Sequence, residues 1–124
     1  MKQLVVYRSS AGSGKTFAIV KQYLSILFSS KSYFAFKEIL AITFTNKAAQ
    51  EMKERILQEL KQNASSEEPS EMLVLIAAEN NISIDEAHLR SKIIYSKIIH
   101  NYSDFNVMTI DRFTNTVISA FYII

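Results

Sequence analysis

A short run near the start of the chain has the residue types that binding of a phosphate chain requires. The run is Ser9-Ser10-Ala11-Gly12-Ser13-Gly14-Lys15-Thr16, and it lies between the apolar stretch Leu4 to Tyr7 and a helical pattern. Gly12 and Gly14 are the only glycines of the chain, and without side chains they let backbone N–H groups come close to phosphate. The sequence therefore predicts a nucleoside triphosphate site.

Each position of this run suits a P-loop that leads into a helix. Lys15 would contact the β and γ phosphates, and the Thr16 hydroxyl would hold Mg2+, so these two are the expected catalytic residues. The loop that wraps the phosphates would comprise Ser10, Ala11, Gly12, Ser13 and Gly14, aided by the dipole of the following helix. Phe17 would either floor the nucleotide base or pack inside the protein. Ser9 stands where the usual pattern has glycine, and the alternative interpretation is a Ser/Gly-rich turn.

Composition limits the class of protein. With 124 residues, 48% of them hydrophobic and 21% charged, the chain is expected to be globular and one domain at most. A net charge of +2 does not by itself argue for nucleic acid, and the absence of cysteine excludes disulfides, thiolate zinc sites and iron–sulfur clusters. His88 and His100 are interpreted as helix-surface residues. No apolar stretch approaches the ~18 residues of a membrane span, so we expect a cytoplasmic protein with no membrane partner.

Strand-like and helical patterns alternate along the chain. The strands are expected at Leu4–Tyr7, Ile39–Phe44 and Phe105–Ile110, and the helices at Lys15–Phe28, Asn46–Lys61, Glu71–Glu79, Ser83–His100 and Asp111–Ile124. The first strand is apolar on both faces, as is typical of a central strand in a parallel sheet covered by helices. The polar stretch Asn63–Ser70 contains the only proline and is expected to be a loop or linker.

Two apolar features suggest missing neighbours. The helix from Ser83 to His100 carries apolar residues on more than one side, so it should be sandwiched or have lost a neighbour. The chain also ends in the apolar run Phe121–Ile124, in mid-pattern. We therefore expect the front portion of a longer protein, which would self-associate when isolated.

A second motif narrows the class of nucleotide enzyme. The segment Ala41–Ile56 reads Ala-Ile-Thr-Phe-Thr-Asn-Lys-Ala-Ala-Gln-Glu-Met-Lys-Glu-Arg-Ile. Together with the loop at Ala11–Thr16 it closely resembles motifs I and Ia of superfamily 1A DNA helicases, the UvrD/Rep/PcrA group. The tail Asn101–Phe113 resembles the motif Ib region of the RecB/AddA branch, although Arg112 stands where that branch usually has serine. Residues 62–100 match no diagnostic motif.

The resemblance implies an α/β fold of the P-loop NTPase class, a partial RecA-like domain whose parallel sheet core is flanked by helices. It implies ATP and Mg2+ as cofactors, and ATP-dependent DNA helicase activity in repair or recombination. The expected division is a P-loop unit at 1–61, a linker at 62–70, a helical segment at 71–101 and a motif Ib-like strand and helix at 102–124. Expected partners are single-stranded DNA or a duplex–single-strand junction, the second RecA-like domain in the remainder of the chain, and a nuclease partner subunit. The fragment alone is expected to be inactive.

The resemblance also implies two sets of DNA contacts. The first is Thr43, Phe44, Thr45 and Asn46, at the carboxyl end of a parallel strand, where α/β sheets present binding loops. Phe44 would stack on a base, and its alternative role is a core aromatic. The second set is Thr109, Asp111 and Arg112. Asp111 could instead be a Walker B carboxylate or a helix N-cap.

Basic residues after the second strand are interpreted differently. Lys47, Lys53 and Arg55 alternate with glutamates at 51, 54 and 59, which favours a solvated, ion-paired helix face over a DNA contact. Two alternatives from other classes stay open: a non-catalytic module that binds nucleotide or single-stranded DNA, and a small P-loop kinase.

Overall fold

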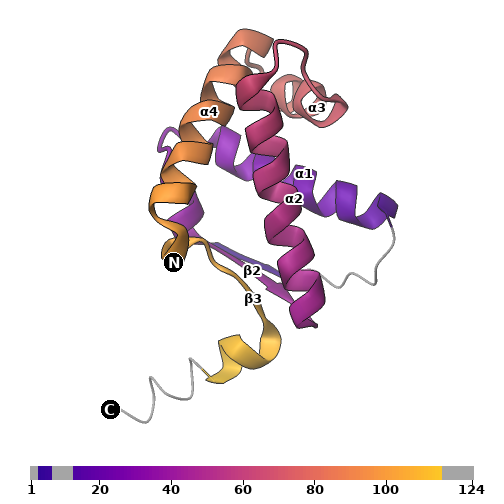
Figure 1. Ribbon diagram of the computed structural model, residues 1–124, viewed down its shortest axis with the longest axis vertical. Helices are drawn as coiled ribbons and strands as arrows, with labels where there is room; N and C mark the ends of the chain where they lie inside the picture. Colours follow the sequence, from indigo (N-terminus) through magenta and orange to yellow (C-terminus); the bar gives the residue numbers. More distant parts are fainter. Residues whose placement is uncertain (1–2, 7–12, 116–124) are drawn as a thin grey trace.

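The computed structural model describes residues 3–6 and 13–115, with side chains from Thr16 onward (Figure 1). Its elements are, in order, β1 (Gln3–Val6), α1 (Ser13–Ser29), η1 (Ala35–Glu38), β2 (Ile39–Thr43), α2 (Asn46–Ser65), α3 (Glu71–Glu79), α4 (Ile84–His100), η2 (Tyr102–Asp104) and β3 (Val107–Thr109). Residues 110–115 are helical. The expectations for Tyr7 and for residues 116–124 lie outside the described residues.

The described strands form one parallel sheet in the order β1-β2-β3. Val5 of β1 pairs with Ala41 of β2, which pairs in turn with Val107 of β3. Parallel pairing was predicted, but the central strand of the described sheet is β2 rather than β1. All five residues of β2 are buried, which matches its unbroken apolar sequence.

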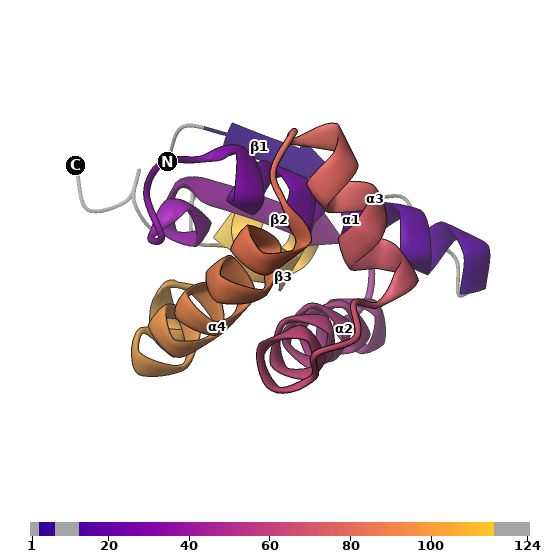
Figure 2. The same ribbon diagram turned by 90° about the horizontal axis from the view of Figure 1, so that it is seen from above.

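Helices α1 to α4 share one hydrophobic core on a single face of the sheet. Ile39, Ala41 and Val107 contribute this face, and the helical residues predicted to be apolar in α1 are all buried in the same core: Val20, Tyr23, Leu24, Leu27 and Phe28. Figure 2 shows α2 and α4 side by side on this side of the sheet, and the two helices are in contact. Leu40 and Ile42 are buried as well but belong to the opposite face, so β2 is covered on both sides.

Helix α2 is longer than the sequence indicated, because the start of the expected linker is helical. Asn63 lies in its last turns and is only 3% exposed. Its side chain accepts a hydrogen bond from Ser70 N and donates one to Ser70 Oγ, both 3.0 Å long. The Ser70 hydroxyl in turn donates to Glu59 Oε2 at 3.0 Å. Asn63 and Ser70, which suggested a loop, thus find hydrogen-bond partners in each other and in Glu59, between α2 and the start of α3.

Helices α3 and α4 begin where the sequence predicted. Ser70 and Ser83 are their N-caps, with side chains that accept hydrogen bonds from Leu73 N and Glu86 N. Only one face of α4 enters the core, since Leu89 is 52% exposed. Of the two alternatives expected for α4, sandwiching is not observed in the described part of the chain, and the exposed Leu89 is compatible with the other, a neighbour that is lost.

The interpretation of His88 as a surface residue is also wrong. His88 is half-buried in α4, and its Nδ1 donates to the Asn63 carbonyl at 2.7 Å. The contact ties α4 to the end of α2.

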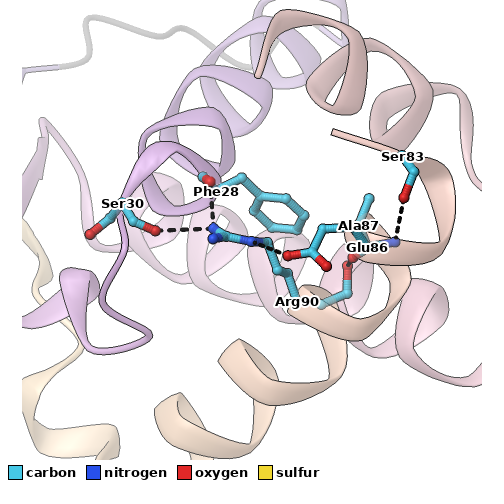
Figure 3. Close-up of polar contacts among 7 residues, drawn as sticks. Phe28, Ser30, Ser83, Glu86, Ala87 and Arg90 are labelled. Atoms are coloured by element: carbon cyan, nitrogen blue, oxygen red, sulfur yellow. Dashed lines mark hydrogen bonds and ion pairs between the residues drawn. The ribbon is translucent and has the colours of Figure 1, made fainter. Parts of the chain in front are cut away.

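The side chain of Arg90 in α4 caps the C-terminal end of α1 (Figure 3). Its Nη1 donates to the carbonyl oxygens of Phe28 at 2.6 Å and Ser30 at 3.0 Å, where the helix has no further N–H groups to offer them. Glu86 receives a hydrogen bond from Arg90 Nε at 3.3 Å, and the guanidinium lies 5.8 Å from the ring centre of Tyr33. A cation at this end also complements the dipole of α1.

Candidate functional site

The candidate site lies at the carboxyl edge of the sheet, where the strands end and α1 and α2 begin. The chain leaves β1 at Val6 and enters α1 at Ser13, so residues 7–12 join a strand end to a helix start. Parallel pairing brings the carboxyl ends of β2 and β3 to the same edge. This is the edge at which open α/β sheets bind ligands.

The start of α1 suits a phosphate group. Its first turn carries no acidic residue, so no carboxylate competes for the unpaired amides or opposes the helix dipole. The backbone of Ser13, Gly14 and Lys15 forms this first turn. Ser10, Ala11 and Gly12 of the predicted loop lie outside the described residues.

The two residues that follow Lys15 are both half-buried. Thr16 makes an interaction within the protein. Phe17 packs against the hydrophobic core, which favours the packing role over a floor for the nucleotide base. The sequence alone left these two roles of Phe17 equally open.

Phe44 emerges from the end of β2 and is 54% exposed. The alternative interpretation as a core aromatic is therefore wrong. Asn46 is exposed beside it, at the first position of α2. Thr45 lies between them and is the N-cap of α2, because its hydroxyl oxygen accepts a hydrogen bond from Ala48 N at 3.0 Å.

Thr43 and Thr109 are partners in the register of β2 and β3, and both are buried. The Thr43 hydroxyl lies 3.2 Å from the carbonyl oxygen of Thr45 and 3.4 Å from that of Met108, and it can donate to either. Thr109 Oγ1 accepts a hydrogen bond from Arg112 N at 3.2 Å. The Thr43 hydroxyl thus contacts the neighbouring strand, and the Thr109 hydroxyl caps the helical residues 110–115. The expected contact of both with DNA stays a prediction.

The same contact corrects the expectation for Asp111. Thr109 rather than Asp111 supplies the capping oxygen for the helical residues 110–115, and Asp111 is exposed within their first turn. Asp111 also lies beyond the end of β3, so the Walker B interpretation gains no support from its position. No group of three or more potential metal ligands of the His, Cys, Asp and Glu types occurs among the described residues.

The environment of Lys53 was not predicted from the sequence. Its Nζ lies 5.5 Å from the ring centre of Tyr102, and burial together with the charge of Arg112 lowers its pKa below the usual lysine value. No ion pair joins Lys47, Lys53 or Arg55 to a glutamate of the described residues, so the predicted ion-paired helix face is not observed. The available signal was the spacing of Lys53, two helical turns beyond Asn46.

Within the described part of the chain, no helix combines the length and apolarity needed to cross a membrane.

Comparison with known proteins identifies the family. The family model described as UvrD/REP helicase N-terminal domain matches residues 1–122. The comparisons with curated proteins and with solved structures gave no match. UvrD-like helicases are P-loop NTPases that in general use ATP and Mg2+ and act on DNA, in line with the strand–loop–helix unit and exposed aromatic described above. Because the match spans nearly the whole sequence, the chain belongs to the UvrD/REP helicase N-terminal domain family.

Proposed function

We propose that this chain is the ATP-binding portion of a DNA helicase of the RecB/AddA type that acts in repair or recombination. One juxtaposition carries the proposal: the start of α1 and the exposed ring of Phe44 lie at the carboxyl edge of one parallel sheet. Such an arrangement couples a phosphate site to a surface for single-stranded DNA. The tail Thr109-Ile110-Asp111-Arg112-Phe113 supports the RecB/AddA assignment.

In the proposed site, the loop from Ser10 to Gly14 binds phosphate through its amides, Lys15 contacts the β and γ phosphates, and the Thr16 hydroxyl faces Mg2+. Bound ATP would supply the γ-phosphoryl group whose hydrolysis drives movement. The chain's own part is to hold the phosphates in line and to offset their charge with Lys15 and the start of α1. Phe44 stacks on a base without reading its identity, while Asn46 and the amides at the start of α2 face the DNA backbone.

We propose that the second RecA-like domain, in the remainder of the helicase chain, completes the ATP site, and that a nuclease subunit is a further partner. The residues 1–124 alone then turn over little ATP, because catalysis also needs an acidic pair and arginine fingers from elsewhere. Single-stranded DNA, or its junction with duplex, is the proposed substrate.

The first test is Lys15→Ala in the full-length protein. Loss of a group that offsets charge in the transition state should lower DNA-stimulated ATP turnover by about 100-fold or more. Lys31→Ala, at an exposed lysine beyond the end of α1, is the matched control and should retain turnover. Undiminished turnover by the Lys15→Ala protein would refute the site.

Two other results would replace the proposal. Binding of nucleotide with no turnover by the unaltered protein would identify a non-catalytic module. Phosphoryl transfer to a small acceptor, insensitive to oligonucleotide, would identify a small P-loop kinase.

A further inference from the structure

One flank of α2, beside β3, carries an aromatic and cationic cluster in which Lys53 and Tyr102 have no role in the proposed function. Lys53 comes from α2, Tyr102 from η2, and Arg112 from the helical residues after β3. The Lys53 ammonium lies over the Tyr102 ring at 5.5 Å from its centre, and Tyr102 is 44% exposed. Three segments distant in sequence thus converge on one partly open surface.

The Tyr102 ring has a fixed position. It meets Phe105 edge-on at 6.0 Å between ring centres, and Phe105 meets the buried ring of Tyr23 in the same way at 6.1 Å. Through this chain of rings the hydrophobic core supports Tyr102, and Tyr102 holds the Lys53 ammonium through a cation–π contact. Less side-chain freedom is therefore left for Lys53 to lose when it binds a ligand.

The charge on Lys53 is poorly compensated. No carboxylate of the described residues forms an ion pair with it. Burial lowers its pKa, and the nearby Arg112 charge lowers it further. Both effects oppose the protonated form, and the charge of an anion bound beside Lys53 would offset them.

The cluster continues the surface around Phe44. Lys53 follows Asn46 by seven residues, so the two share one flank of α2 and are about 10 Å apart along the helix axis. Single-stranded nucleic acid binds to surfaces that combine cations along the backbone with aromatic rings. A strand stacked on Phe44 would meet Lys53 next if it followed this flank.

We propose that Lys53 binds a phosphate of single-stranded DNA outside the Phe44 loop, and that Tyr102 is the positioning residue that holds its ammonium. The inference rests on the proposed function, since it extends the path of the same DNA strand. It assigns the α2–β3 flank as the direction in which that strand leaves the Phe44 loop.

The test is the salt dependence of oligothymidylate affinity, measured with the full-length protein. Lys53→Gln should weaken binding and reduce the slope of log K against log salt by about 0.7, the value for one phosphate contact on a single strand. Lys53→Arg should restore the slope. Tyr102→Phe should bind normally because it keeps the ring, whereas Tyr102→Leu should weaken binding. Lys61→Gln, at an exposed lysine further along α2, is the charge-matched control and should leave the slope unchanged.

Three outcomes would overturn the inference. If Lys53→Gln leaves the slope unchanged while Phe44→Ala weakens binding, the strand takes another path and the proposed function stands. If Lys53→Gln lowers the melting temperature but not the slope, the Lys53–Tyr102 contact is an internal latch. If the unaltered protein binds no oligothymidylate, the inference and the DNA part of the proposed function both fail.

Discussion

Phe44 directly follows β2 and is the first exposed residue after this buried strand. The five residues before it are covered, and the next one, Thr45, already caps α2. A large aromatic that stays more than half exposed has given up much of its hydrophobic stabilisation, roughly 1.5–3 kcal/mol for full burial. A base stacked on the ring would recover part of that free energy.

Replacing Phe44 tests this role. Phe44→Ala should weaken binding of single-stranded oligonucleotide by about 1–3 kcal/mol, the usual worth of one stacked base. Phe44→Tyr should bind nearly as well, and the melting temperature should hardly change because the ring is exposed. Phe34→Ala removes another exposed phenylalanine, one that precedes η1 at the opposite end of β2, and serves as control. Fluorescence anisotropy would measure all three, and equal losses for Phe44→Ala and Phe34→Ala would contradict the role.

Lys53 also predicts a dependence of stability on pH. Because burial and Arg112 oppose its charge, its pKa in the folded protein is below the unfolded value of 10.5. At pH below the folded pKa both states are protonated and the penalty is fully present. As the pH rises from the folded pKa toward 10.5 the folded state loses its proton first, so Lys53 destabilises the fold less.

Urea unfolding can measure this shift. In a Tyr102→Phe background, which keeps the ring and removes its hydroxyl group, Lys53→Met should stabilise the protein near neutral pH. The advantage of the methionine should shrink toward pH 10.5. An advantage that stayed constant over this range would show that Lys53 has an ordinary pKa.

At the scale of elements, α3 and α4 support the helix that follows the loop. Glu79 at the end of α3 accepts hydrogen bonds from Lys21 and Ser25 of α1, and these contacts lower its pKa. Arg90 of α4 donates hydrogen bonds to the carbonyls of Phe28, in the last turn of α1, and of Ser30, just beyond its end. The stretch with no diagnostic motif therefore has a clear structural role: it fixes α1 along its length and at its end.

Losing the contacts of Arg90 should destabilise the protein more than losing those of Glu79. Arg90→Met should lower the free energy of unfolding by about 3 kcal/mol, since two carbonyls lose hydrogen bonds from a charged donor. Arg90→Lys should recover part of the loss, because lysine keeps the charge but lacks the planar fork. Arg55→Met, at an exposed arginine of α2, should change stability by no more than about 0.5 kcal/mol. Denaturant unfolding would measure the set, and similar losses at 90 and 55 would contradict the assignment.

Across the whole molecule, the sequence predicted what periodicity and capping determine locally. The buried stripe of α1, the parallel strands and the starts of α3 and α4 all follow from apolar spacing or from a serine cap. The length of α2 was missed because Asn63 reads as a loop residue until its partners in Glu59 and Ser70 are known. Those partners become neighbours only after folding.

In the candidate site, too, the features that the sequence did not predict are those that depend on tertiary structure. Exposure of Phe44 and the inward hydrogen bonds of Thr43 and Thr109 depend on the register of β2 with β3, which no local pattern encodes. The cap by Thr109 in place of Asp111 likewise depends on where β3 ends. The residue types alone indicated which side chains could bind phosphate or DNA. Which of these side chains are exposed became clear only from the arrangement of the strands in the sheet.

The contact of Arg90 with α1 has a mechanical consequence. Helix α1 has 17 residues, so it is a strut about 25 Å long with the predicted phosphate loop at one end and the Arg90 guanidinium at the other. Tilting or sliding of α1 would stretch or break these charge-assisted hydrogen bonds unless α4 moved with it. We therefore expect a displacement of the start of α1 on nucleotide binding to shift α4 as well, and with it the exposed Leu89.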